Sequence, residues 1–195
     1  MAISIAAATT QHPCIIACCG DKGLLIFDMV EYNLLTLQDA RNTHGEKQST
    51  CMAVCGESDV VILATRNETC VTPWNLNQQE SRQPFEVGHQ QGITSLASCI
   101  VQGKMIIVTG SLDKTAIVWD YESGKVLQRL AGSHTDTITA VATHSPTASS
   151  HYPYSVVTGS TDMTAVVWDL LSGCVLNVLA GAHSEVSSLN SKTST

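Results

Sequence analysis

Basic residues are scarce in this chain of 195 residues, which has 10 Lys plus Arg against 17 Asp plus Glu and a net charge of −7. The basic residues are scattered, so no basic stripe can follow a phosphate backbone, and direct nucleic-acid binding is not expected. No apolar run approaches the length of a membrane span, and residues 1–10 lack the positive charge that opens a signal peptide. We expect one domain, no membrane contact, and a location in the cytoplasm, the nucleus or both.

Recognisable catalytic and metal-binding motifs are also missing. The sequence has no phosphate-cradling glycine loop, no cluster of metal ligands and no single nucleophile with a partnered base. The eight cysteines do not alter this interpretation. Cys14 and Cys18 fall on one face of an expected strand about 13 Å apart, which is too far to share a zinc ion. We expect buried free thiols, no cofactor and no enzymatic activity.

Helix patterns are nearly absent. Apolar runs are short and end at Gly, Asp, Asn or Ser, which is typical of strands and turns. One such unit is repeated, because residues 108–120 (VTGSLDKTAIVWD) return almost unchanged as residues 157–169 (VTGSTDMTAVVWD). Weaker copies upstream place Trp74 and Phe27 at the same position, so the aromatic anchors recur at intervals of 45 to 49 residues. A period in the mid-forties with a Trp-Asp dipeptide is typical of propeller blades.

These repeats resemble the WD40 family, in which each repeat supplies four antiparallel strands to one blade of a β-propeller. The resemblance rests on the Ser/Thr-Gly-Ser-x-Asp turn, the Trp-Asp pair and a His 30 to 34 residues before the Trp, and it covers the chain from about Ile3 to Leu189. It implies an all-β propeller of about four blades within a single WD40-repeat domain over residues 1–195. The expected blades are residues 3–37, 50–87, 93–130 and 138–179, followed by the start of a further repeat at 183–189 and a polar tail at 190–195.

In that family a His, a Ser or Thr, an Asp and the Trp form a hydrogen-bonded set of four inside each blade. The resemblance places two such sets here, namely His89, Thr109, Asp113 and Trp119, and His134, Thr158, Asp162 and Trp168. A set of this kind satisfies the buried imidazole and indole N–H groups. A hydrolase triad is the alternative for His, Asp and Thr, but a triad is built once at a cleft, whereas this set recurs with the repeat. We therefore expect a structural role.

The first two repeats depart from this pattern. The second keeps His44 and Trp74 but has Ala64 in place of the hydroxyl residue and Glu68 in place of the Asp. Pro73 also removes a backbone donor beside the Trp. The first repeat has neither the Trp nor a securely placed His. We expect both blades to form through apolar packing, with fewer specific hydrogen bonds than the third and fourth blades.

The resemblance implies a non-catalytic scaffold or adaptor that holds other proteins or peptides on the top face and blade edges of the propeller within a multisubunit complex. In the family, top-face contacts fall three and five residues after each His and just before the turn Asp. Transferred to this chain, these positions are Lys47, Ser49, Asn67, Gly92, Thr94, Leu112, Thr137, Thr139, Thr161, Val186 and Ser188. The set is rich in hydroxyl groups and poor in the aromatic and Arg anchors of strong interfaces.

Two alternatives stay open. One is a non-catalytic subunit of an RNA-processing or RNA-modifying complex, in which a partner subunit binds the RNA. The other is a substrate receptor of a ubiquitin ligase, which would be expected to carry Trp-Asp-x-Arg at a repeat end. Glu122 and Leu171 stand where that Arg would be, so this second alternative is weakened.

Four repeats are fewer than the seven or eight that are usual in the family. The explanations are a fragment or shortened isoform of a larger propeller, a half-propeller that closes against a partner or its own copy, and a self-closed ring of four blades. In the first two cases unpaired sheet edges remain, and exposed edges pair with other chains. We therefore expect self-association through the open propeller edges.

The purified chain should contain no tightly bound zinc, and all eight thiols should react under reducing conditions after unfolding. The reason is that the strand spacing of the cysteines separates them beyond the reach of a shared ligand or a disulfide. Metal analysis and thiol titration in denaturant measure both quantities. One equivalent of bound zinc would contradict the interpretation of the cysteines as core thiols.

Overall fold

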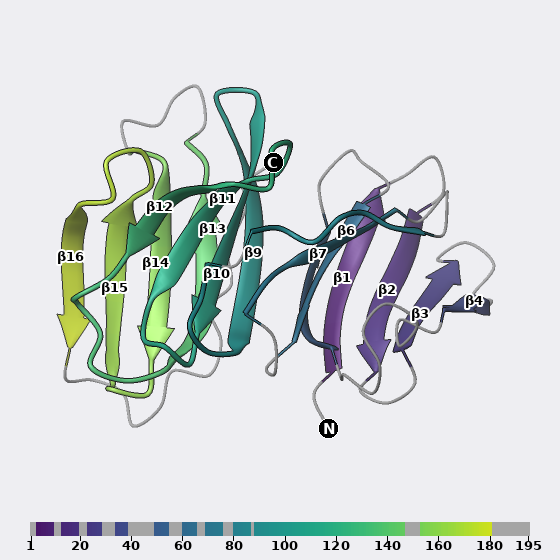
Figure 1. Cartoon of the computed structure of the whole chain (residues 1–195), viewed down its shortest axis with the longest axis horizontal. Helices are drawn as coiled ribbons and strands as arrows, with labels where there is room; N and C mark the ends of the chain where they lie inside the picture. Colours follow the sequence, from purple (N-terminus) through teal and green to yellow (C-terminus); the bar gives the residue numbers. More distant parts are fainter. Residues whose placement is uncertain are drawn as a thin grey trace.

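The computed structural model describes the backbone of residues 3–9, 13–19, 23–28, 34–38, 49–54, 60–65, 69–75, 80–86, 88–146 and 153–180 (Figure 1). It describes side chains for residues 60, 62–64, 69–75, 82–86, 88–146 and 153–180. Within the described residues all regular structure is strand, and no helix is present that is long and apolar enough to cross a membrane.

Four antiparallel sheets of four strands follow one another along the chain, each with its strands in sequence order. The first sheet contains β1 (Ile3–Thr9), β2 (Pro13–Cys19), β3 (Gly23–Asp28) and β4 (Leu34–Gln38). The second contains β5 (Ser49–Val54), β6 (Val60–Thr65), β7 (Thr72–Asn75) and β8 (Glu80–Ser81). The third contains β9 (Ile93–Val101), β10 (Lys104–Ser111), β11 (Ala116–Asp120) and β12 (Val126–Leu130). The fourth contains β13 (Ile138–His144), β14 (Ser155–Ser160), β15 (Thr164–Asp169) and β16 (Val175–Ala180). The predicted all-β class is confirmed.

The sheets are stacked through their first strands. β5 contacts both β1 and β9, and β9 contacts both β5 and β13, so the four first strands lie next to one another in chain order. The outer strands β4 and β16 lie at opposite ends of the molecule in Figure 1. Each sheet is therefore one blade, and its neighbours in sequence are also its neighbours in space.

The aromatic anchors occupy one register position. Trp119 pairs with Ile107, Trp168 pairs with Val156, and Phe27 pairs with Ile15, in each case across the second and third strands. A β-bulge lies immediately before each of these aromatic residues, where the third strand pairs with the fourth. The bulge bends and twists the strand locally. The first blade thus keeps the backbone geometry of the later repeats although Phe27 replaces the Trp.

The Asp of the Trp-Asp pair forms the turn into the outer strand. The Asp120 carboxylate accepts hydrogen bonds from the backbone N–H groups of Glu122 at 2.8 Å and Ser123 at 3.2 Å. The Asp169 carboxylate repeats this geometry in the fourth blade. Gly124 then adopts a φ of 66°, which glycine tolerates without a steric penalty. The dipeptide thus combines a core anchor with a side chain that shapes the turn.

The third blade has two apolar faces, because successive residues of a strand point to opposite sides of a sheet and both sets are apolar here. On the third blade, Ile117 and Trp119 pack with Ile62 and Phe85 of the second blade region. Val118 lies between them in sequence and packs on the other side with Val166 of the fourth blade. Burial of a side chain of this size contributes about 1.5–3 kcal/mol. The apolar core therefore lies between blades.

Hydroxyl groups join the third and fourth blades along β9 and β13. Thr143 Oγ1 donates to the carbonyl of Ser98 at 3.0 Å, and Ser145 Oγ donates to Ile100 at 3.3 Å. At the other end of the strands, Thr94 Oγ1 lies within hydrogen-bond distance of the Ile138 carbonyl. These bonds link the two blades directly and fix the register between them.

Gly110 marks the closest approach of these two blades. A Cβ atom at Gly110 would overlap Ile138 Cγ2 and lie 2.9 Å from Val141 Cγ2, both on β13. Because Ile and Val are stiff at χ1, the neighbouring strand cannot yield by a simple rotation. The glycine is required here by the distance between blades.

Replacement of Gly110 by Ala should lower the free energy of unfolding by about 1–3 kcal/mol, the usual cost of overpacking a core. Urea denaturation measures this loss. Glu122→Ala is the control, since Glu122 is exposed and its replacement adds no atom to the space between blades. Equal losses for the two variants would contradict the packing argument.

Candidate functional site

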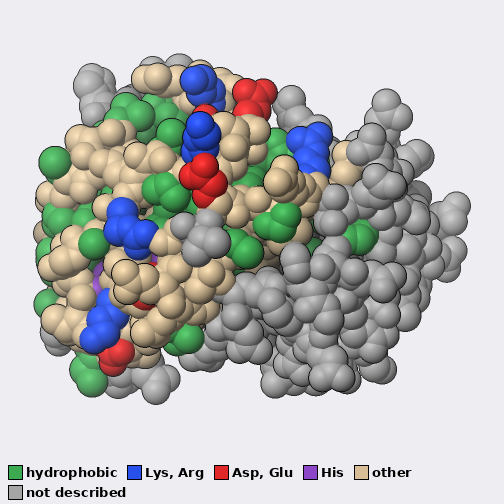
Figure 2. Space-filling view, in the orientation of Figure 1, with side chains coloured by type: hydrophobic (Ala, Val, Ile, Leu, Met, Phe, Trp, Pro, Cys, Tyr) green, Lys and Arg blue, Asp and Glu red, His purple; other side chains and the backbone are tan. Residues whose placement is uncertain are grey.

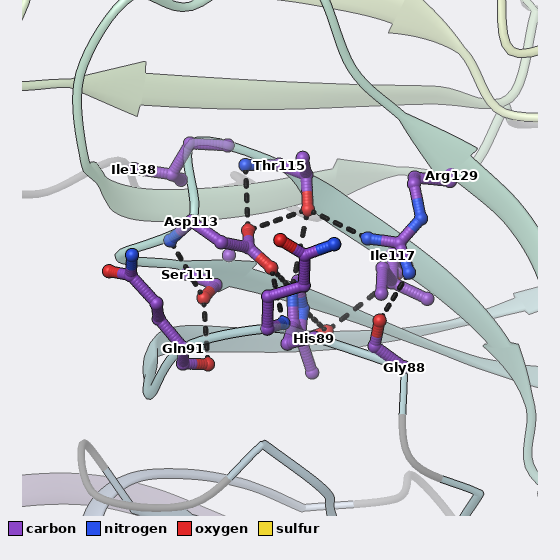
Figure 3. Close-up of polar contacts among 12 residues, drawn as sticks. Gly88, His89, Gln91, Ser111, Asp113, Thr115, Ile117, Arg129 and Ile138 are labelled. Atoms are coloured by element: carbon purple, nitrogen blue, oxygen red, sulfur yellow. Dashed lines mark hydrogen bonds and ion pairs between the residues drawn. The ribbon is translucent and has the colours of Figure 1, made fainter.

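The turns between the second and third strands of the last two blades have the same structure. In the third blade, Asp113 Oδ1 accepts bonds from the Thr115 hydroxyl at 2.6 Å and the Thr115 backbone N–H at 3.0 Å, and Ser111 Oγ accepts from the Asp113 N–H (Figure 3). Lys114, between Asp113 and Thr115, adopts a φ of 70°. The fourth blade repeats each of these contacts with Ser160, Asp162, Met163 and Thr164.

A hydrogen-bond network runs from this turn into the interior of the third blade. His89 Nδ1 lies 3.0 Å from Asp113 Oδ2, and His89 Nε2 lies 2.8 Å from Thr109 Oγ1. The indole Nε1 of Trp119 donates to the same Thr109 oxygen at 2.8 Å. A carboxylate accepts only, so His89 Nδ1 donates to Asp113, and the Thr109 oxygen links the imidazole to the indole. The structure therefore brings the first predicted set of four together.

The second predicted set has the same geometry in the fourth blade. His134 Nδ1 lies 3.1 Å from Asp162 Oδ2, and His134 Nε2 lies 2.8 Å from Thr158 Oγ1. Trp168 Nε1 donates to Thr158 Oγ1 at 2.8 Å. Both His rings, both Thr residues and both Trp residues are buried, so every polar group in the set depends on its partners.

The network holds both carboxyl groups ionised. Burial raises the pKa of Asp113, but hydrogen bonds from His89, Thr115 and the Gln90 N–H outweigh it and hold that pKa well below its usual range. Burial likewise opposes ionisation of Asp162, yet bonds from Thr164, the Thr135 N–H and His134 lower its pKa to about 2. Because Gln90 and Thr135 lie on the surface loops before β9 and β13, each Asp ties an exposed loop to the core.

These groups are arranged for structure and not for nucleophilic attack. The Thr109 hydroxyl is fully buried, and it accepts from Trp119 while contacting His89. A nucleophile needs an exposed face toward a substrate, and Thr109 presents none. The same holds for Thr158 in the fourth blade.

The sequence analysis did not identify Arg129, Gly88 or the Thr two residues after each turn Asp. Arg129 on β12 reaches over the network, where one guanidinium nitrogen donates to the Thr115 hydroxyl at 3.3 Å and another to the Gly88 carbonyl (Figure 3). Gly88 itself lies so close to Trp119 that a Cβ atom would overlap the indole ring. The Thr two residues after each turn Asp was a readable signal, because it recurs in both repeats. Arg129 gave no such signal, since Val178 occupies its register position in the fourth blade.

The second blade lacks this network among its described residues. The register corrects the expected alignment of this blade: Trp74 pairs with Val61 as Trp119 pairs with Ile107, so Leu63 stands at the hydroxyl position and Ala64 at the position of Gly110. Ala64 is fully buried with Ile62 in the apolar cluster shared with the third blade. The Thr72 hydroxyl is buried and has no hydrogen-bond partner in the part of the chain that is described. His44 and Glu68 lie outside the described residues.

The predicted top-face residues fall in several environments. Lys47, Asn67, Val186 and Ser188 lie outside the described residues, and for Ser49 only the backbone, at the start of β5, is described. Gly92 is buried, and Thr161 alone among the described members of the set is exposed, whereas Thr94, Leu112, Thr137 and Thr139 are half-buried. The Leu112 N–H donates to Gly92 and the Thr161 N–H donates to Thr137, each at 3.0 Å, so the turns and the preceding loops share one end of the sheets.

Contacts within the blades use part of this set. The Thr94 hydroxyl lies within hydrogen-bond distance of the carbonyls of Gly110 and Ile138 and so joins two blades.

Two residues at the turn tips are exposed and do not belong to the predicted top-face set. Met163 is 53% exposed, and Lys114 donates to the Thr135 carbonyl at 2.7 Å. Both follow a turn Asp directly, and that position could have identified them.

The comparisons with known proteins agree with this architecture. The model of the WD domain, G-beta repeat (WD40) matches residues 81–120 and 124–169. Coatomer subunit beta'-2 of Arabidopsis thaliana is 35% identical over 71 residues, which are 36% of this chain and 8% of that protein. Guanine nucleotide-binding protein subunit beta-5b of Danio rerio is 30% identical over 103 residues, which are 52% of this chain and 24% of that protein.

A solved structure shows the same fold. The crystal structure of RRP9 WD40 repeats superimposes with a TM-score of 0.76 at 20% identity, over 93% of this chain and 52% of that one. The chain therefore spans about half the length of this solved relative and less than a quarter of the two matched subunits.

Replacement of Asp162 by Asn should lower the free energy of unfolding by about 1–3 kcal/mol near neutral pH, because His134 and two backbone N–H groups lose a charged acceptor. The folded pKa is depressed from 3.8 to about 2, so this contribution is present above pH 4 and is lost as pH falls through the folded value. Urea denaturation from pH 6 to pH 2 should show the gap between wild type and variant narrowing.

Glu122→Gln is the matched control, since Glu122 is exposed and lies outside both networks. It should follow the wild-type chain at every pH. A gap for Asp162→Asn that stays constant from pH 6 to pH 2 would contradict the role of the ionised carboxylate.

Proposed function

We propose that this chain, a WD40-repeat protein, is a non-catalytic scaffold or adaptor that joins other proteins in a multisubunit complex. The observation that carries the proposal is the recurrence of the His, Thr, Asp and Trp network in two blades with its hydroxyl buried. The His, Asp and Thr residues, which most resemble a catalytic set, therefore hold turns in place. Rigid turns on a stacked sheet scaffold are suited to binding other chains.

The proposed contact surface is the end of the third and fourth blades that carries the turn tips. Thr161, Met163 and Lys114 are exposed there, beside the loops that hold Gln90 and Thr135. Side chains of mixed type gather at the surface of the described part of the molecule, without a field of one charge (Figure 2). Such a surface fits a polar peptide or protein, with Met163 as an apolar anchor.

The two matched proteins are both named as subunits, which supports a place in a complex and does not identify which one. A subunit of an RNA-processing complex and a ubiquitin-ligase receptor are the alternatives within this proposal. A location in the cytoplasm, the nucleus or both belongs to the proposal as well. The proteins that co-purify with the tagged chain distinguish these complexes.

The double variant Thr161→Asp and Met163→Asp should reduce capture of the main partner about tenfold, the effect of losing roughly 1.4 kcal/mol of binding free energy. Quantitative mass spectrometry after affinity purification measures the capture. Ser123→Asp is the control, because Ser123 is exposed on the turn at the other end of the third blade. Equal capture by wild type and the double variant would contradict this contact surface, and co-purification of no protein at all would contradict the scaffold function.

A further inference from the structure

The repeat provides an internal reference for the outward face of the fourth blade. Since Ile107 pairs with Trp119 and Val156 pairs with Trp168, residues of the two blades can be matched by register. In this match Val157 corresponds to Val108, Val167 to Val118, and Leu179 to Leu130. All six side chains are aliphatic, so the two blades present the same chemistry on the same face.

The burial of these matched side chains differs sharply. In the third blade Val108, Val118 and Leu130 are at most 2% exposed, because the fourth blade covers them. In the fourth blade Leu179 is 54% exposed, and Val157 and Val167 are half-buried. Figure 2 shows apolar side chains at the edge of the molecule where Figure 1 places β16. The fourth blade thus has a partly exposed apolar face, defined by Val157, Val167 and Leu179. The corresponding face of the third blade is buried.

The third blade also shows what covers such a face. Its cover begins with the first strand of the next blade, because β13 contacts both β9 and β10. Ile138 begins β13 and packs against Gly110, where a glycine makes room for it. Gly159 occupies the matching position in the fourth blade, opposite Ala165 as Gly110 is opposite Ala116. The complementary element is therefore a first strand that begins with a branched apolar residue.

The first strand of this chain has that form. Ile3 begins β1 opposite Cys19 at the end of β2, the register position at which Ile138 of β13 lies opposite Ser160 at the end of β14. Ser4 follows Ile3 as Thr139 follows Ile138. β1 contacts β5 as β9 contacts β13, so its blade already stacks in the same sense. The fourth blade of one molecule can accordingly receive the first blade of another.

We propose that the apolar face of Val157, Val167 and Leu179 binds the first blade of a second copy of this chain. Two such junctions, related by a two-fold axis, close the pair and leave neither fourth-blade face open. This pairing stands on the blade faces and is independent of the contact surface at the turn tips.

The test is the mass of the 195-residue chain in solution across a concentration series, measured by light scattering and sedimentation. Wild type should be a discrete dimer of two 20.8 kDa chains. Leu179→Glu should weaken dimerisation by roughly a hundredfold or more, because each dimer buries two copies of Leu179 and every 1.4 kcal/mol changes affinity tenfold. Leu127→Glu is the matched control, since Leu127 is 56% exposed on the equivalent outer strand β12 and should leave the dimer intact.

Ile3→Glu alters the opposite side of the same junction and should weaken the dimer as Leu179→Glu does. A circular dichroism spectrum matching wild type shows that a monomeric variant is still folded. A wild-type monomer at all concentrations, a ladder of larger oligomers, or a dimer that Leu179→Glu leaves unchanged would each overturn the pairing. Loss of the dimer with Leu127→Glu would overturn it as well.

Discussion

The structure depends on one constraint, which is that a four-stranded sheet with two apolar faces, such as the third blade, can bury neither face without a neighbour. Trp119 and Val118 are adjacent on β11 and yet belong to different clusters, one shared with the second blade and one with the fourth. Stability in such an array comes from the interfaces between repeats as much as from the repeats themselves. The glycine at position 110 and the hydroxyl bonds of Thr143 and Ser145 follow from this close stacking.

The polar networks provide hydrogen-bond partners for groups that packing between blades would otherwise bury unpaired. A Trp side chain large enough to fill the space between blades brings an indole N–H into an apolar interior, where an unpaired donor is costly. Thr109 accepts from that donor, His89 engages the Thr, and Asp113 fixes the His tautomer. Because the same Asp also holds the Gln90 backbone, the interior packing determines the shape of the surface turn. The turn tips and the core are therefore parts of one structure.

The repeats show how much of this was readable in advance. Short apolar runs that end at turn residues predict short strands, and the repeated Trp-Asp unit predicts propeller blades. The sheets confirm the all-β fold, and the family match confirms the WD40 resemblance. The spacing of His, Thr, Asp and Trp named the residues that the structure joins by hydrogen bonds. The top-face set stays a prediction; it includes Thr94, whose hydroxyl lies between blades, and leaves out Met163, which is exposed at a turn tip.

Sequence by itself determined the strands, the turns and the order of the blades, because strand periodicity and turn chemistry act within about ten residues. Only the tertiary structure decided the environment of residues that the repeat makes equivalent. Leu130 and Leu179 are both leucines at equivalent register positions, yet Leu130 is buried and Leu179 is more than half exposed. The difference lies in the neighbouring sheet, since burial depends on what packs against a side chain and not on the strand that carries it.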